Sequence, residues 1–206
     1  MKIAVIDYNM GNLASVAKAL RYHGAEPELI SRPADLPRFG CALLPGVGNF
    51  GDGMENLNAS GMSGAVKAFI RAGKPLFGIC LGMQMLLESS EEAPGVAGLG
   101  IFPGGCRRFP SGSLKVPQIS WNVANFTDRH PLSAGLPEHP YFYFVHSYYV
   151  PPEDYTIARG EYIVPFSAAI GAGMCFATQF HPEKSQDTGL KLLKNFLTLA
   201  EDHAKK

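Results

Sequence analysis

The stretch PLFGICLGMQMLLE, residues 75–88, decides the fold. It opens with a short apolar run that suits a strand buried on both faces. From residue 81 to residue 88 the apolar side chains follow a helical pattern. A strand that passes directly into a helix is typical of an α/β protein.

The same alternation precedes this stretch. We expect strands over residues 2–7, 28–31 and 41–44, and helices over residues 13–24 and 56–72. Strands and helices that alternate at this spacing imply right-handed crossovers and a doubly wound, mostly parallel sheet. Ligands of such sheets gather at the carboxyl ends of the strands.

The chain changes in character after residue 95. Short β-like runs occur near Arg107 and Ile119 and over residues 141–150, 155–158 and 173–179, separated by Gly and Pro turns. We expect antiparallel strands that extend the sheet, and a closing helix over residues 187–202. With no internal repeat or linker, residues 1–206 are expected to form a single domain.

The composition indicates a folded chain without a charge bias. Apolar residues make up 46% of the 206 residues and charged residues 17%, enough buriable surface to offset chain entropy. Lys plus Arg equal Asp plus Glu at 18 each, so no positive field favours nucleic acid or anionic lipid. No apolar run approaches the roughly eighteen residues of a membrane span, and no secretory leader is evident. We expect a cytoplasmic protein without nucleic-acid or membrane partners.

Cysteines stand at positions 41, 80, 106 and 175. They form no CxxC pair and no cluster with histidine at zinc spacing. We expect three of the four to be reduced thiols packed as small hydrophobes. Neither a metal nor another cofactor is expected.

Cys80 is the exception because of its surroundings. The motif Gly78-Ile79-Cys80-Leu81-Gly82 has the spacing of the G-x-S-x-G nucleophile elbow, with sulfur in place of oxygen. Such a strained turn leaves no room for a Cβ on either side, and the dipoles of the following helix favour an exposed, nucleophilic thiolate. From this motif alone, simple packing of Cys80 between sheet and helix is an equally good explanation.

A second motif, QFHPE at residues 179–183, supplies the partners that a nucleophilic thiol needs. His181 would hold the proton of the thiol, and Glu183 would orient the ring if Pro182 sets the turn. A His-x-Glu by itself is more often a strand-end histidine beside a solvated carboxylate. Together with an elbow cysteine about a hundred residues upstream, the catalytic interpretation is favoured.

A third motif, Pro45-Gly46-Val47-Gly48, follows the strand over residues 41–44. Its backbone N–H groups could point at a developing oxyanion, although a Gly-rich strand-to-helix turn explains the stretch equally well. It lacks the GxxxxGK[ST] pattern of a phosphate loop, which disfavours an NTPase.

These motifs, PGVG, GICLGMQ and QFHPEKS in that order, resemble the class I glutamine amidotransferases over nearly the whole chain. DYNMGNLASV at residues 7–16 and YFVHSYYV at residues 143–150 resemble more narrowly the glutaminase subunits of imidazole glycerol phosphate synthases, of histidine biosynthesis. The resemblance implies a flavodoxin-like α/β fold that hydrolyses glutamine to glutamate and ammonia.

The resemblance also implies roles for single residues. Cys80 would attack the side-chain amide carbon of glutamine, with His181 as proton donor and then base, and Glu183 holding the ring. The backbone of Val47 and Leu81 would form the oxyanion hole. The α-amino and carboxylate groups of glutamine would be held by Gly48, Gln84, His146, Ser147 and Tyr148. Without the resemblance, Gln84 would be taken as a solvated helix residue and Tyr148 as a packed strand aromatic.

The partner implied by the resemblance is a separate (β/α)₈ barrel synthase in a heterodimer, which joins the ammonia to a ribulosyl ribonucleotide. Residues implied to face it are Gly11, Asn12, Trp121 and Asn122. The sequence departs from the family at Gln118 and Ser120, where a histidine and a glycine are usual, and at Ala14, where an arginine is usual. These departures bear on coupling to the synthase and leave the catalytic residues untouched.

Val47 is expected to act as a switch. Gly46 and Gly48 on either side let its peptide rotate, so that its N–H is aimed at the oxyanion or withdrawn from it. Partner binding would favour the productive orientation.

Three other functions remain open at this point. The chain resembles, less closely, ammonia-donating glutaminases such as the anthranilate type. A cysteine hydrolase of the peptidase or γ-glutamyl hydrolase kind would turn over without a partner. A non-catalytic binding module would have no use for intact Cys80, His181 and Glu183.

Overall fold

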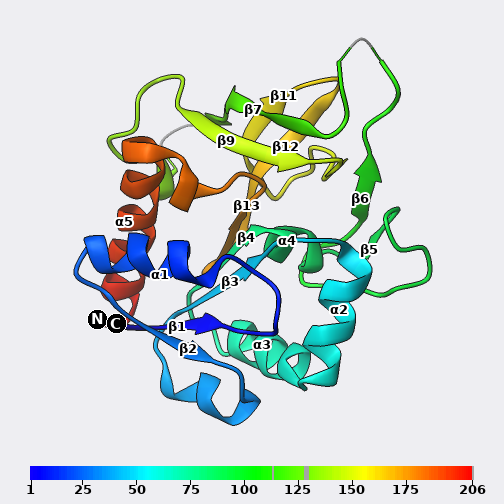
Figure 1. The fold of residues 1–206 in the computed structure, drawn as a ribbon. Helices are drawn as coiled ribbons and strands as arrows, with labels where there is room; N and C mark the ends of the chain where they lie inside the picture. The colour runs from blue at the N-terminus through cyan, green and yellow to red at the C-terminus, as the bar shows by residue number, and fades with distance from the viewer. Residues whose placement is uncertain (113, 128–129, 206) are drawn as a thin grey trace.

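The computed structural model describes residues 1–112, 114–127 and 130–205. A large sheet crosses the molecule in the order β2-β1-β3-β4-β13-β12-β11-β8 (Figure 1). Its parallel part consists of β2 (Glu26–Ile30), β1 (Lys2–Ile6), β3 (Ala42–Gly46), β4 (Leu76–Cys80) and β13 (Cys175–Thr178). Antiparallel strands extend it, namely β12 (Pro165–Ala172), β11 (Thr156–Glu161) and β8 (Asn125–Phe126). The predicted mixed α/β sheet is confirmed, but the run at residues 173–179, expected among the antiparallel strands, forms β13, which pairs parallel with β4 and antiparallel only with β12.

Helices cover both faces of this sheet (Figure 1). On one face α1 (Leu13–Tyr22) and α5 (Gln186–His203) bury their apolar sides in one hydrophobic cluster. A second cluster holds the apolar sides of α2 (Phe50–Ala59), α3 (Met62–Arg71) and α4 (Leu81–Met85). Short 3₁₀ turns are η1 (Pro33–Arg38), η2 (Pro131–Ser133) and η3 (Pro182–Lys184). Two clusters on opposite sides of one sheet are the result expected of a doubly wound fold.

The helix predicted over residues 56–72 is wrong as a single element. The Asn49 side chain caps α2 by accepting from the Asp52 backbone N–H at 2.8 Å, so this helix starts before residue 56. Gly61 then breaks the run with a φ of 74°, a left-handed conformation that glycine adopts without steric cost. The chain therefore forms two helices where apolar spacing alone indicated one.

The helix predicted over residues 81–88 also ends early, at Met85. The carbonyls of Leu86 and Leu87 accept hydrogen bonds from the backbone of residues 100–102 instead of continuing the helix. The chain then enters β5 (Ser89–Ser90). A loop distant in sequence thus replaces the hydrogen bonds that the end of the helix would have made.

Not all the predicted β segments join the large sheet. The run predicted over residues 141–150 is divided at Ser147 into β9 (Tyr141–His146) and β10 (Tyr148–Tyr149). β9 pairs with β7 (Gln118–Val123) in a two-stranded ribbon, whereas β10 joins β6 (Gly105–Arg108) and β5 in a separate small sheet. In Figure 1 the ribbon lies at the end of the molecule opposite α3.

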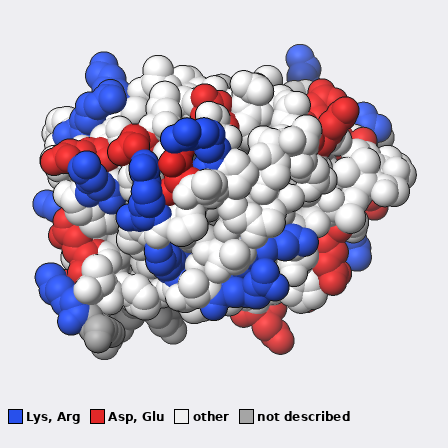
Figure 2. Space-filling view, turned by 90° about the horizontal axis from the view of Figure 1, so that it is seen from below, with Lys and Arg blue, Asp and Glu red and all other residues white. Residues whose placement is uncertain are grey.

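Surface charge agrees with the balanced composition. Among the described residues on the face shown in Figure 2, Lys and Arg side chains are interspersed with Asp and Glu. None of the described helices has the length and hydrophobicity that crossing a bilayer demands.

Candidate active site

Cys80 ends β4 in a strained conformation. Its φ of 54° and ψ of −108° are unusual for a residue with a side chain. A Cβ on Gly82 would collide with the Leu44 carbonyl of β3, and a Cβ on Gly78 would lie 3.0 Å from the Ala177 Cβ of β13. The tight turn predicted from the GxCxG spacing is therefore present, and both glycines are required by close approach of neighbouring strands.

The thiol is less exposed than predicted. Cys80 is 8% exposed and lies in the wall of a cavity of about 280 Å³. The strand end that carries it is covered by the β9–β10 segment, which also lines this cavity. The sulfur is thus reached through the cavity and does not stand on an open surface.

His181 comes to the same place because β13 lies beside β4. The two strands are parallel, with Thr178 opposite Ile79, so the residues that follow them meet at one edge of the sheet. His181 lines the cavity together with Cys80, and its Nδ1 lies 2.8 Å from Glu183 Oε1. Both side chains are 1% exposed.

The charge state of His181 follows from these neighbours. Burial lowers the pKa of the ring, but the Cys80 sulfur and the Glu183 carboxylate outweigh burial and raise this pKa to about 10. The buried Nε2 makes no hydrogen bond with the part of the chain that the structure describes. An imidazolium held against a carboxylate, with one nitrogen left over, can give a proton to a leaving group in the cavity.

The loop after β3 lies at the edge of the same cavity. Val47 and Gly48 both line it, and Gly48 has a φ of 106°. Within the described chain, neither backbone N–H of these two residues donates a hydrogen bond. Free N–H groups beside a nucleophile are the elements of an oxyanion hole.

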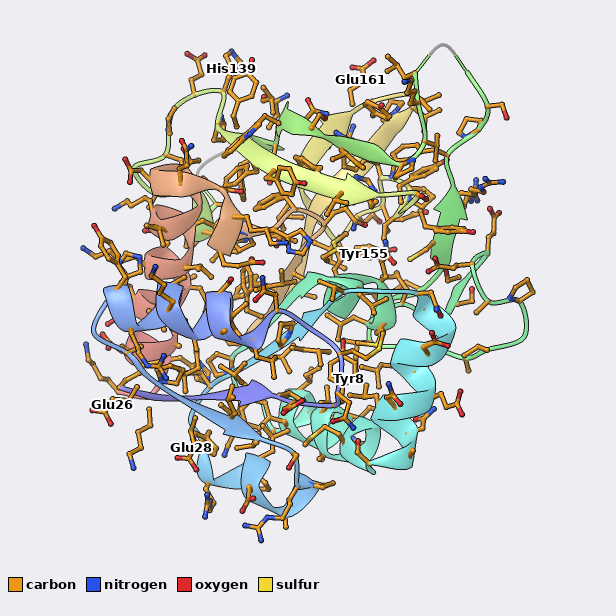
Figure 3. The ribbon with its side chains drawn as sticks, viewed as in Figure 1. Tyr8, Glu26, Glu28, His139, Tyr155 and Glu161 are labelled. Carbon is orange, nitrogen blue, oxygen red and sulfur yellow. The ribbon has the colours of Figure 1, made fainter. Side chains whose placement is uncertain are left out.

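Tyr8 packs against Gly46, the residue at which β3 passes into this loop. It lies just beyond the end of β1, in the interior (Figure 3), and is 1% exposed. A Cβ on Gly46 would collide with its hydroxyl. Burial and the nearby Cys80 sulfur raise the pKa of Tyr8, so the hydroxyl stays protonated at neutral pH.

Gln84 faces the cavity from α4 and is fixed by two acceptors. Its Nε2 donates to the Tyr148 backbone carbonyl and to Gln179 Oε1, both at 3.1 Å. Its own Oε1 accepts nothing from the described residues and remains available to a ligand. Gln84 is 5% exposed, so it is not the solvated helix residue that the sequence alone would favour.

His146 serves as a wall of the cavity. Its Nδ1 lies 2.8 Å from the Tyr148 carbonyl and its Nε2 lies 3.0 Å from Gln118 Oε1. Burial lowers the pKa of His146 to about 4, so the ring is neutral at pH 7. The Tyr148 carbonyl can only accept, so the neutral ring donates from Nδ1, and its Nε2 is left as an acceptor that pairs with the Gln118 amide only through the NH₂ of that amide. Gln118 is fully buried, so this departure from the family lies against the site and not on the surface.

The cavity thus brings together most of the residues singled out in the sequence. All the candidate catalytic, oxyanion and glutamine-binding residues line it except Glu183, which lies behind the His181 ring. Gly11, Asn12, Trp121 and Asn122 do not line it. Gly11 and Asn12 precede α1, near Pro45, and Trp121 is 46% exposed on β7 rather than packed in the core.

Two residues of the site were missed from the sequence. Glu92 lines the cavity and accepts a hydrogen bond from the Phe50 N–H at 2.8 Å. Gln179 donates toward the Cys80 sulfur. Glu92 lies in an irregular loop, so no local pattern marked it, whereas Gln179 belongs to the QFHPE motif and was passed over in favour of His181.

The other cysteines fit the simple interpretation. Cys41, Cys106 and Cys175 are free, and each is at most 3% exposed. Burial raises the pKa of all of them, to about 12 for Cys41 and Cys175. They are packed as small hydrophobes, as predicted.

Comparison with known proteins supports one family. Residues 4–200 match the family model described as glutamine amidotransferase class-I. Imidazole glycerol phosphate synthase subunit HisH of Microcystis aeruginosa is 47% identical over 95% of this chain and 94% of its own. The HisH of Moorella thermoacetica is 45% identical over 94% and 93%.

Solved structures agree on the fold. A crystal structure described as a glutamine amidotransferase superposes with a TM-score of 0.76 at 20% identity, covering 96% of this chain and 98% of its own. The structure of PurLQS from Thermotoga maritima gives the same TM-score, identity and coverage.

Proposed function

Because this chain belongs to the class I glutamine amidotransferases, we propose that it is the glutaminase subunit of an imidazole glycerol phosphate synthase in histidine biosynthesis. The observation that carries the proposal is the cavity in which Cys80 and His181 meet, with Glu183 bonded to the ring. The relatives at 42–47% identity bear the name of this subunit. Residues 1–206 act as one glutaminase domain, in the cytoplasm.

The first half of the reaction forms a thioester. The Cys80 thiolate attacks the side-chain amide carbon of glutamine, and the oxyanion that develops accepts hydrogen bonds from the backbone of Val47 and Leu81. The His181 imidazolium gives its proton to the departing nitrogen, which leaves as ammonia. The raised pKa of His181 keeps this proton in place at neutral pH until the tetrahedral intermediate needs it.

The second half releases glutamate. His181, now neutral, takes a proton from water as the water attacks the thioester carbon, and the sulfur leaves as thiolate. Glu183 holds the ring through Nδ1 in both halves, so that Nε2 faces the cavity.

The remaining walls select glutamine. The free Oε1 of Gln84 and the carboxylate of Glu92 are acceptors suited to the α-ammonium group. The backbone of Gly48 and of the segment from His146 to Tyr148 holds the rest of the amino-acid moiety. A cavity of about 280 Å³ is suited to one amino acid and too small for a peptide strand.

The proposed partner is a separate (β/α)₈ barrel synthase in a heterodimer. It receives the ammonia and forms imidazole glycerol phosphate and a carboxamide ribonucleotide. Gly11, Asn12, Trp121 and Asn122 are the residues proposed to face it. Partner binding is proposed to turn the Val47 peptide toward the oxyanion.

Reconstitution with a barrel synthase tests this function. Glutamate release is expected to be slow for the free chain and strongly stimulated by the synthase with its ribonucleotide ligand. Cys80→Ala is expected to abolish glutamate release, while the synthase still turns over with added ammonia. A free chain that hydrolyses glutamine as fast as the complex would indicate a cysteine hydrolase that needs no partner. Stimulation only by an anthranilate-type synthase would assign the chain to a different biosynthetic pathway.

A further inference from the structure

Gln179 lies behind the wall of the cavity, in contact with Cys80 and Gln84, and has no part in the reaction as described so far. It is fully buried. Its Nε2 lies 3.8 Å from the Cys80 sulfur, and its Oε1 accepts from Gln84 Nε2 at 3.1 Å. A buried amide between the nucleophile and a wall of the substrate cavity calls for a physical explanation.

The orientation of this amide is dictated by its neighbours. The Tyr148 carbonyl can only accept, so the Gln84 group that faces it is the NH₂. The same NH₂ also faces Gln179, which must answer with its oxygen. The remaining end of Gln179, an N–H donor, is therefore the one directed at the sulfur.

The backbone and the next shell hold this arrangement in place. The Gln179 N–H donates to the Ala168 carbonyl of β12 at 2.8 Å, which fixes the end of β13. The Tyr148 carbonyl that aligns Gln84 also contacts His146 Nδ1 at 2.8 Å. The chain of contacts from His146 through Gln84 to Gln179 ends at Cys80.

An N–H directed at sulfur has a defined effect. It stabilises the thiolate more than the neutral thiol or the thioester, because the charge is on the sulfur only in the thiolate. A side-chain amide neither gains nor loses a proton near neutral pH. Unlike His181, Gln179 therefore cannot exchange a proton with water or substrate, and it remains a hydrogen-bond donor to the sulfur throughout the reaction. Its directionality also fixes the side-chain rotamer of Cys80 toward the cavity.

We propose that Gln179 is a positioning residue, which holds the Cys80 sulfur as an oriented thiolate and is itself aligned by Gln84. This inference rests on the proposed glutaminase function, since it assigns the sulfur as nucleophile. It adds a hydrogen-bond donor to the electrostatic interaction between the Cys80 sulfur and His181. Gln179 also contacts Gln84, which lines the substrate cavity. Glutamine that binds to Gln84 can therefore change the orientation of the Cys80 thiolate through Gln179.

The test compares Gln179→Met and Gln179→Glu with the unaltered chain. Iodoacetamide alkylation of Cys80 is followed across pH on the free chain, by mass spectrometry of the peptide that contains it. The midpoint of the alkylation profile is expected to move up by about one pH unit in Gln179→Met, the typical effect of one lost hydrogen bond to a charge. Gln179→Glu should move it further in the same direction, because a carboxylate beside the sulfur opposes the thiolate.

Kinetics in the complex with the barrel synthase provide the second readout. In Gln179→Met, kcat for glutamine hydrolysis is expected to fall about tenfold with KM changed less than about threefold, because the lost contact is to the sulfur and not to substrate. Thr178→Val is the matched control. Its hydroxyl is fully buried one residue away and donates to the Phe180 carbonyl at 3.0 Å, so this variant should lose stability and keep the alkylation midpoint.

The outcomes separate the two proposals. If Gln179→Met lowers the melting temperature but keeps the alkylation midpoint and kcat, Gln179 only fills space and the inference is overturned. If Cys80 of the unaltered chain reacts no faster than buried Cys41 at any pH, the glutaminase function itself fails, whatever the Gln179 variants do.

Discussion

Glu92 is expected to affect the binding of glutamine and not the rate of its hydrolysis. It places a carboxylate on the cavity wall, where burial raises its pKa and the Phe50 N–H partly offsets this rise. We expect Glu92→Gln to raise KM for glutamine about 10- to 100-fold, the usual cost of one charged hydrogen bond. The kcat should change little, because Glu92 is proposed to contact the α-ammonium and not the amide.

The same residue gives a pH dependence with a definite sign. A raised carboxyl pKa means that Glu92 becomes protonated, and loses its attraction for an ammonium, at a higher pH than an ordinary glutamate. KM for glutamine should therefore rise as the pH falls below neutrality, and Glu92→Gln should flatten this rise. Steady-state kinetics of the complex between pH 5 and 8 would measure it, and an unchanged slope in the variant would assign the ammonium site elsewhere.

Among elements, the break between α2 and α3 allows a matched pair of substitutions. Gly61 has a φ of 74°, which costs a residue with a Cβ about 1 kcal/mol or more. Gly64 lies inside α3 with open space around its Cβ position, where alanine is favoured by roughly 0.5–1 kcal/mol. Gly61→Ala should therefore lower the free energy of unfolding and Gly64→Ala should raise it.

Urea unfolding of the two variants measures this difference. Both substitutions add one methyl group near the same helix, so a general effect of the added volume would move them in the same direction. Stabilisation by Gly61→Ala would show that the left-handed turn is not required to separate α2 from α3.

The elements also show where sequence patterns reach their limit. β1, β3 and β4 were predictable because apolar runs indicate burial on both faces. The run that forms β13 has no such pattern and was expected to be antiparallel, yet it pairs parallel with β4. β12 was missed, because its sequence PFSAAIGA is rich in small residues with weak strand preference. Its environment makes it a strand: β11 and β13 pair with it on both sides.

For the molecule as a whole, the β7–β9 ribbon presents an apolar surface at one end. The register places Ile119, Trp121 and Val123 opposite Val145, Tyr143 and Tyr141, and so on one face of the ribbon. Ile119 is 60% exposed, Trp121 46% and Tyr141 56%, whereas Phe142 and Phe144 on the other face are fully buried. His139 and Glu161 lie at this same end of the molecule (Figure 3). An exposed aromatic surface of this kind is typical of a protein interface.

Trp121 is the only tryptophan in the sequence, so its fluorescence reports on this surface. We expect the barrel synthase to change the emission of Trp121 on binding, and Trp121→Ala to weaken the complex at least tenfold, as an interface aromatic commonly does. Alkylation of Cys80 in the free chain should be unaffected. Leu29→Ala is the control, because Leu29 is a similarly exposed apolar residue on β2, an edge strand of the large sheet. This variant should bind the synthase as the unaltered chain does. If the two variants weaken the complex equally, the partner does not bind at the β7–β9 ribbon.

The sequence by itself determined the features that depend on neighbours along the chain. The GxCxG spacing marks the turn at Cys80, His181 and Glu183 need only Pro182 between them to meet, and apolar runs mark β1, β3 and β4. Only the tertiary structure decided which polar side chains surround the sulfur. Gln84 and Gln179 are 95 residues apart, and Gln179 and Cys80 are 99 apart. They meet because β13 pairs with β4, and such long-range pairing depends on the packing of the whole sheet, which no local pattern encodes.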